Sequence, residues 1–301
     1  MPESLQYEVF HETIFEYSAP VSFSHNIAKL KPTDNDIQTL LQYTLHVTPE
    51  ADNISQYIDY FGNETTQLFI KESHKKLSLV AKSIVEINVK AIHKKIASYK
   101  DVDITQQILK KHLANSYNAE VLFLKQYLFP SELIDYPNEK IINYAKKSFQ
   151  RYDNLYLVVK DFVQRIFNDF EFVSDFSEIN TPIAVIFEEK KGVCQDFASL
   201  AIAALRAFGI PTRYASGYIQ TYPPEGKEKL FGVDASHAWI SVYFGEYGWI
   251  DFDPTNNKIP NEEYIQLGYG RDYNDITPLK GVVQGNATSK LSVSVDVREK
   301  Q

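Results

Sequence analysis

The residues of this sequence that could do chemistry begin with one cysteine. Cys194 is the single cysteine among 301 residues, and it precedes an almost wholly apolar stretch, residues 195–208, that predicts a buried helix. The unsatisfied amides and the positive dipole end of a helix start favour a thiolate, which is a nucleophile. Gly192 would let the backbone turn sharply into that helix. A lone cysteine is also commonly a small buried hydrophobe, so position alone leaves both interpretations open.

Two further residues supply groups that would activate such a thiol. His237 begins the predicted strand 237–244, and Asp253 ends the predicted strand 249–253. The glycine-bearing loop 245–248 predicts a hairpin between them. A thiolate, an imidazole and a carboxylate are the parts of an activated thiol nucleophile: the sulfur attacks a carbonyl, the imidazole relays a proton, and the carboxylate orients the imidazole.

This interpretation sets a geometric condition on the hairpin. His237 and Asp253 can touch only if they lie on the same face of the sheet, which requires directly opposed residues to have numbers with an even sum. If Asp253 lay on the opposite face, Asp251 or Asp234 would be the next candidates for the orienting carboxylate.

The elements that must position these residues show two kinds of periodicity. Apolar and polar residues alternate with period two in segments 7–17, 41–48 and 77–89, which predicts antiparallel strands with a turn at residues 61–64. Residues 154–170 have the i, i+3, i+4, i+7 spacing of an amphipathic helix, and Thr181-Pro182 begins another short helix. Segments 212–220 and 291–297 are further predicted strands.

Four motifs in this order resemble the bacterial transglutaminase-like superfamily, a group of cysteine proteases with a papain-like core. They are GVCQDFA at 192–198, RYASGY at 213–218, ASHAW at 235–239 and GWIDFDPTN at 248–256. Residues 7–32 and 61–63 resemble the N-terminal β-domain of that family, and residues 270–278 resemble its C-terminal segment.

The resemblance implies a fold and a set of roles. We expect an α+β protein in which residues 1–115 form an N-terminal antiparallel β-domain. Residues 116–301 would form a papain-like catalytic core, a helix carrying the cysteine packed on an antiparallel sheet, with a C-terminal strand. Cys194 would be the nucleophile, His237 the general base and acid, and Asp253 the orienting carboxylate. The backbone amide of Cys194 is the candidate for one oxyanion donor.

Such a site predicts cleavage or transfer of an amide bond through a thioester. We expect hydrolysis, because water is abundant and cross-linking needs a site that excludes it. Three alternatives stay open: transfer of an amine to protein-bound glutamine, removal of glycans from asparagine, and a non-catalytic interaction protein that retains the fold.

Composition limits the remaining possibilities. The formal net charge of −8 argues against a nucleic-acid scaffold, which needs a cationic surface. One cysteine allows no internal disulfide and no thiolate-rich metal site, and no spacing predicts a metal or an organic cofactor. The sequence shows neither a secretory signal nor an apolar run long enough to span a membrane. We therefore expect a cytoplasmic enzyme with a protein or peptide substrate and no membrane partner, in an oligomeric state that the sequence does not indicate.

Overall fold

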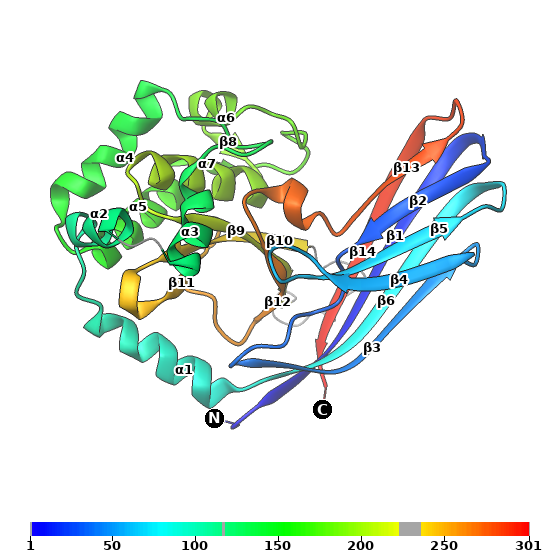
Figure 1. The fold of residues 1–301 in the computed structure, drawn as a ribbon, viewed down its shortest axis with the longest axis horizontal. Helices are drawn as coiled ribbons and strands as arrows, with labels where there is room; N and C mark the ends of the chain where they lie inside the picture. Colours follow the sequence, from blue (N-terminus) through cyan, green and yellow to red (C-terminus); the bar gives the residue numbers. More distant parts are fainter. Residues whose placement is uncertain (1, 116–117, 223–235, 301) are drawn as a thin grey trace.

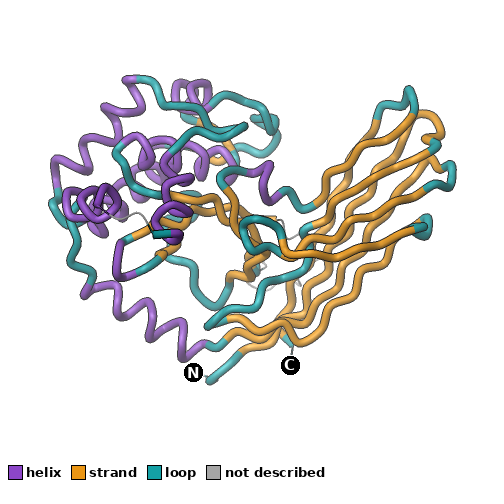
Figure 2. Tube along the Cα trace, in the orientation of Figure 1, coloured by secondary structure: helices purple, strands orange, loops and turns teal. Residues whose placement is uncertain are grey.

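Helices and strands are segregated in this protein. A computed structural model describes residues 2–115, 118–222 and 236–300. In Figure 1 the helices lie on the left, a strand-rich part lies on the right, and a short sheet lies between them. Figure 2 shows the same separation by type of element. The predicted α+β fold is confirmed.

The chain runs through strands, then helices, then strands again. The first strands are β1 (Leu5–Val21), β2 (Phe23–Ala28), β3 (Gln38–Thr48), β4 (Asn53–Ile58), β5 (Glu64–Ile70) and β6 (His74–Ile87). The middle of the chain forms α1 (Val89–Ser98), α2 (Gln106–Asn115), α3 (Ala119–Lys125), α4 (Glu139–Arg151), α5 (Leu155–Asp169), β7 (Glu171–Phe172), α6 (Ile183–Glu189), β8 (Lys191–Gly192) and α7 (Cys194–Ala207). The last strands are β9 (Thr212–Ile219), β10 (Ser236–Tyr243), β11 (Trp249–Phe252), β12 (Tyr264–Gly270), β13 (Leu279–Gln284) and β14 (Ser289–Glu299).

The strand-rich part is built from two four-stranded antiparallel sheets. Their strand orders are β14-β1-β6-β3 and β13-β2-β5-β4. Buried side chains of both sheets share one apolar cluster, which includes Val21 of β1, Leu68 of β5 and Leu79 of β6. The turn predicted at residues 61–64 joins β4 to β5, with Gly62 in the left-handed region at φ 88°. The two sheets therefore form a sandwich with its own core.

The last strands correct the predicted division of the chain. The C-terminal strand was expected within a core of residues 116–301, but β14 pairs with β1, from Tyr7 opposite Glu299 to Tyr17 opposite Ser289. β13 likewise pairs with β2. The reason is that β14 occupies the open edge of β1, where Val295 and Val297 extend the apolar face that Val9 presents to β9 and β12.

The other end of the predicted β-domain also differs from the structure. The last strand of the first segment ends at Ile87, and α1 and α2 follow before residue 115. Leu109 and Leu113 of α2 are buried in the core of the helical part rather than in the sandwich. The helical part therefore begins near residue 89, and the sandwich is completed by residues 279–299.

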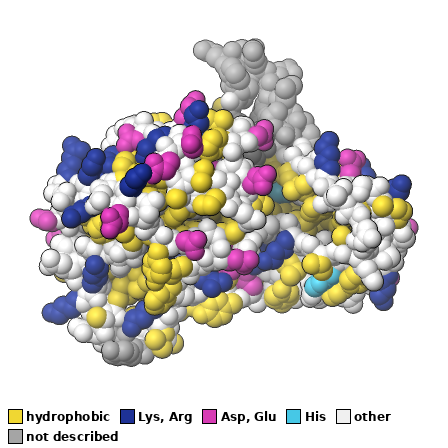
Figure 3. All heavy atoms as spheres, turned by 90° about the horizontal axis from the view of Figure 1, so that it is seen from above, with side chains coloured by type: hydrophobic (Ala, Val, Ile, Leu, Met, Phe, Trp, Pro, Cys, Tyr) yellow, Lys and Arg dark blue, Asp and Glu magenta, His cyan; other side chains and the backbone are white. Residues whose placement is uncertain are grey.

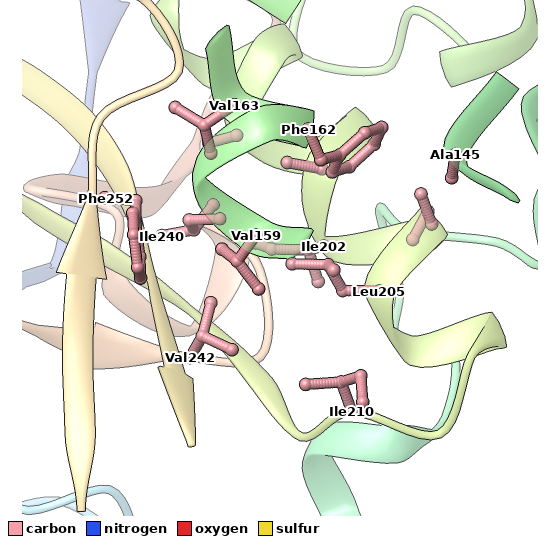
Figure 4. Packing of buried hydrophobic residues seen from close by; sticks show 14 of the residues in the cluster. Ala145, Val159, Phe162, Val163, Ile202, Leu205, Ile210, Ile240, Val242 and Phe252 are labelled. Atoms are coloured by element: carbon pink, nitrogen blue, oxygen red, sulfur yellow. The ribbon is translucent and has the colours of Figure 1, made fainter. Parts of the chain in front are cut away.

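The helix α7 lies at the centre of the helical part. Every residue from Asp196 to Arg206 is buried, which agrees with a sequence that is apolar almost all round. Figure 4 shows Val159, Phe162 and Val163 of α5 packed near Ile202 and Leu205 of α7. Ile240 and Val242 of β10 close the cluster from the other side. Helix α7 is thus held between the other helices and the sheet.

The sheet beneath α7 has the order β11-β10-β9-β12 and connects the two parts of the molecule. One set of its side chains packs against the helices, and Tyr218, Ile265 and Leu267 pack against Val9 and Val297 of the sandwich. On the face shown in Figure 3, basic and acidic side chains are interspersed. Within the described residues, no helix has both the length and the apolarity needed to cross a bilayer.

Candidate active site

The hairpin brings His237 and Asp253 together. Ile240 lies opposite Phe252 and Val242 opposite Ile250, so opposed residues have numbers with an even sum, as the predicted pairing requires. Nε2 of His237 donates to Oδ2 of Asp253 across 2.7 Å. The His237 side chain is 8% exposed and that of Asp253 is fully buried.

Four further hydrogen bonds surround the Asp253 carboxylate. Oδ2 accepts from the Tyr264 hydroxyl at 2.7 Å and from Nδ2 of Asn256 at 2.7 Å. Oδ1 accepts from the backbone N–H groups of Thr255 and Asn256 at 2.8 and 3.1 Å. Burial raises the pKa of Asp253, but the hydrogen bond and the charge of His237, with the other donors, outweigh it and lower that pKa. This carboxylate is therefore held ionised and in one orientation.

The same carboxylate determines the charge of the imidazole. Burial lowers the pKa of His237, while hydrogen bonds to Asp253 and Cys194 and the charge of Asp253 raise it, with a net rise from 6.5 to about 10. Because Nε2 faces Asp253, Nδ1 is the ring nitrogen that can form the hydrogen bond with the sulfur of Cys194. The geometry favours an imidazolium beside Cys194 at neutral pH.

Cys194 is the first residue of α7 and is half-buried. The start of this helix is fixed by Asp196, whose Oδ2 accepts from the backbone N–H of Val193 at 2.8 Å and from the hydroxyl of Ser177. The carboxylate thus caps the turn that carries the sulfur.

Gly192 has a different role from the one predicted. It does not have a left-handed conformation; the left-handed residue at this turn is Lys190, at φ 55°. A Cβ at position 192 would lie 2.9 Å from Cβ of Asp196. Glycine is required because the capping side chain passes directly over the backbone.

Two tyrosines lie close enough to Cys194 to be affected by its charge. Burial, and then the charge of Cys194, raise the pKa of Tyr214, and the same two causes act in the same order on Tyr273. Their rings meet edge to face, with centroids 6.3 Å apart. Both phenols therefore stay protonated next to the sulfur and keep the ability to donate a hydrogen bond.

Of the other carboxylates considered for the orienting role, Asp251 is hydrogen-bonded to a different residue. Oδ2 of Asp251 accepts from Nε1 of Trp239 at 3.0 Å, two positions away from His237 on the strand. Asp234 lies outside the described residues. Among the described residues, no group of three or more histidine, cysteine, aspartate or glutamate side chains is placed to hold a metal ion.

Sequence reasoning missed two partners of Asp253. Asn256 belongs to a motif that was singled out, but nothing in its spacing indicated contact with the carboxylate. Tyr264 lies on β12, which is adjacent to β9 at the far edge of the sheet, so no local pattern connects it with β11. Asp196 follows Val193 by three residues, a spacing typical of a helix cap, and could have been found from that signal.

The chain is similar to proteins of one family along most of its length. Residues 7–86 match the bacterial transglutaminase-like N-terminal region, and residues 142–254 match the transglutaminase-like superfamily. An uncharacterized protein of Mycobacterium tuberculosis is 34% identical over 300 residues, which cover 97% of this chain and 92% of that protein. A protein-glutamine gamma-glutamyltransferase of Pseudomonas aeruginosa is 34% identical over 84 residues, 28% of this chain and 12% of that protein.

A solved structure has the same fold. It is described as a "putative cysteine protease" from Cytophaga hutchinsonii, with a TM-score of 0.75 and 22% sequence identity, and the match covers 100% of this chain and 92% of that one. The Mycobacterium relative is similar over almost its whole length, and the core match includes Cys194, His237 and Asp253. The chain belongs to the transglutaminase-like superfamily.

Proposed function

We propose that this protein is a cysteine-dependent amide hydrolase that acts on protein or peptide substrates through a thioester. The observation that carries the proposal is the buried His237–Asp253 pair at 2.7 Å, with Cys194 hydrogen-bonded to the same imidazole. Five hydrogen bonds hold Asp253 ionised, and this negative charge favours the protonated form of the imidazole next to the sulfur. An imidazolium in turn favours the thiolate form of a neighbouring cysteine.

The proposed reaction follows from these charges. The Cys194 thiolate attacks the carbonyl carbon of an amide, and the backbone amide of Cys194 at the start of α7 stabilises the developing oxyanion. The His237 imidazolium then gives its proton to the leaving amine, and the C–N bond breaks to leave a thioester. Water, deprotonated by the neutral imidazole, attacks the thioester and releases the acid and the thiol.

The first test measures the reactivity of the one cysteine with iodoacetamide near pH 6. A Cys194 thiolate paired with His237 should be alkylated roughly tenfold or more faster than glutathione, since glutathione is almost wholly protonated at that pH. The His237→Gln variant should react at least tenfold more slowly than the unchanged protein. Labelling of the folded protein as slow as that of glutathione would contradict the proposal and favour a non-catalytic binding role.

A second candidate function is amine transfer to glutamine. The 84-residue similarity to a protein-glutamine gamma-glutamyltransferase favours amine transfer over the removal of glycans from asparagine. Mass spectrometry of a glutamine peptide incubated with the protein and a primary amine shows whether water or the amine accepts the acyl group. We expect deamidation or chain cleavage to exceed amine incorporation, and the opposite ratio would make transfer the principal reaction.

The protein or peptide substrate and the cytoplasmic location remain predictions from the sequence. A panel of peptides cut or deamidated by the unchanged protein, with the Cys194→Ala variant as control, would test the substrate class. Activity on a glycoprotein alone would replace peptide hydrolysis by glycan release.

A further inference from the structure

A cavity next to the candidate active site lies between the sandwich and the connecting sheet, and it shares with that site the side chain of Tyr264, the hydroxyl donor to Asp253. Its volume is about 370 Å³, and neither Cys194 nor His237 lines it. One wall is formed by residues 35–38, Ile87 and the helix α1, and the other by side chains of β9 to β12. Such a volume holds a molecule of the size of an acylated amino acid or a dipeptide.

The cation on the sheet side of this cavity has an unusual environment. The guanidinium of Arg213 lies 3.3 Å from the ring centroid of Tyr269 and 4.2 Å from that of Trp249. Stacking between two rings fixes the plane of the guanidinium and thereby orients its donors. The side chain is therefore preorganised, which reduces the entropy lost when an anion binds.

The Arg213 side chain is hydrogen-bonded to Tyr269 but has no carboxylate partner among the described residues. None of the described carboxylates forms an ion pair with it, and its buried Nε has no hydrogen-bond partner among the described residues. Asp251 lines the same cavity, but its Oδ2 already accepts from Trp239 and, at 3.4 Å, from Tyr269. A planar cation with one buried, unpartnered N–H in a concave, ring-lined site matches a carboxylate.

The remaining walls define the rest of a ligand. Ile37, Ile92 and Ile259 supply apolar surface beside the two tryptophans, and Lys95 of α1 adds a second positive charge. Asp36 and Asp251 lie on the same lining and can accept a hydrogen bond from an amide N–H. The lining thus combines a place for a carboxylate, an N–H acceptor and an apolar surface.

We propose that this cavity binds a small organic carboxylate that carries an amide and an apolar or aromatic body, of the class of N-acylated amino acids. Its carboxylate pairs with Arg213, and its body packs against Trp249, Ile37 and Ile259. The proposal does not rest on the hydrolytic activity, because neither Cys194 nor His237 lines the cavity.

The test uses intrinsic fluorescence, since both tryptophans of the chain line the cavity. N-acetyl-L-phenylalanine should change the tryptophan emission saturably, while N-acetyl-L-phenylalaninamide, which lacks the carboxylate, should bind at least tenfold more weakly. The binding should persist after Cys194 is alkylated with iodoacetamide, which excludes binding at the candidate active site. Equal binding of the two probes, no saturable change with either, or loss on alkylation would overturn the proposal.

Variants locate the site. Lys95→Glu should weaken binding of the acid about fivefold, whereas Lys94→Glu, the same charge change on the exposed neighbour that does not line the cavity, should leave it unchanged. Arg213→Gln should abolish the preference for the acid over the amide. If Arg213→Gln fails to fold, the comparison of Lys95→Glu with Lys94→Glu still tests the location of the site. Equal effects of these two variants on binding of the acid would contradict the assignment.

Discussion

His237 and His11 are both buried histidines, yet their surroundings drive them to opposite charge states. His237 at the candidate active site donates to the Asp253 carboxylate, and its pKa is raised to about 10. His11, in the first sheet of the sandwich, is 1% exposed, and its two ring nitrogens are hydrogen-bonded to the hydroxyl groups of Tyr218 at 3.0 Å and Thr13 at 2.9 Å. Burial lowers the pKa of His11 to about 4.

The difference shows what burial does by itself. Neutral hydroxyls can form hydrogen bonds with a ring nitrogen, but they do not offset the free energy that a charged imidazole loses when it is removed from water. His11 therefore stays neutral. An ionised partner reverses the result for His237. A buried histidine in this fold is therefore structural unless a carboxylate accompanies it, and the strongest test is to remove that carboxylate.

Asp253→Asn should convert His237 to the behaviour of His11. Without the negative charge, burial dominates and the imidazole becomes neutral, so the alkylation rate of Cys194 near pH 6 and any amide hydrolysis should fall on the order of 10² to 10⁴-fold. Circular dichroism should show the fold retained. An alkylation rate within threefold of the unchanged protein would mean that Asp253 does not set the charge of the imidazole.

The alkaline limb of stability should depend on His237. Its folded pKa lies above its unfolded value of 6.5, so its stabilisation is complete below pH 6.5 and is lost as pH rises through about 10. Urea unfolding from pH 6.5 to 10 should show a loss on the order of a few kcal/mol that His237→Gln lacks. The comparison between the two proteins cancels the titration of lysines and tyrosines. Parallel curves for both would contradict the raised pKa.

The acid limb should depend on His11 in the opposite sense. Its folded pKa lies below its unfolded value, so between pH 6.5 and about 4 the unfolded chain binds the extra proton and stability falls with acid. The unchanged protein should lose roughly 3 kcal/mol more than His11→Gln over this range. Alkylation of Cys194 should be the same in both proteins. Slower alkylation of Cys194 in His11→Gln would show that the sandwich and the candidate active site are coupled.

The smallest effects should come from the tyrosines beside the two histidine sites. Tyr264→Phe removes one of the hydrogen bonds to Asp253 and should slow Cys194 alkylation about fivefold, since one hydrogen bond contributes about 1 kcal/mol. Tyr218→Phe removes the hydroxyl that faces His11 and should lower stability by about 1 kcal/mol without changing alkylation. Loss of one tyrosine hydroxyl should thus affect alkylation at His237 and stability at His11. Slower alkylation in Tyr218→Phe but not in Tyr264→Phe would contradict the difference between the two histidines.

Much of this site could be predicted because its main parts lie on local patterns. The period of two in β10 and β11 and the glycine-bearing loop between them predicted the hairpin, and its observed register meets the even-sum condition that was set for His237 and Asp253. The apolar stretch after Cys194 indicated α7 to within one residue. Each of these inferences needs only neighbours in the chain.

What the sequence did not reveal depends on contacts between distant segments. The apolar alternation of residues 291–297 predicted a strand correctly but could not say that its partner is β1. Tyr264 reaches Asp253 only because β12 lies beside β9, and the cavity around Arg213 exists only because α1 and residues 35–38 face the connecting sheet. Alternation determines which side chains share a face, but it does not determine which sheet covers that face.

The pairing of β1 with β14 has a consequence for the order in which the protein folds. Strand β1 can pair with β6 early in synthesis, but its other edge stays open until Ser289–Glu299 has been made, after the whole helical part. Contacts of such long sequence separation form slowly, and an open strand edge can recruit another chain in the meantime. The helical part with its candidate site can therefore assemble first, and closure of the sandwich is the late step at which a nascent chain is most exposed to aggregation.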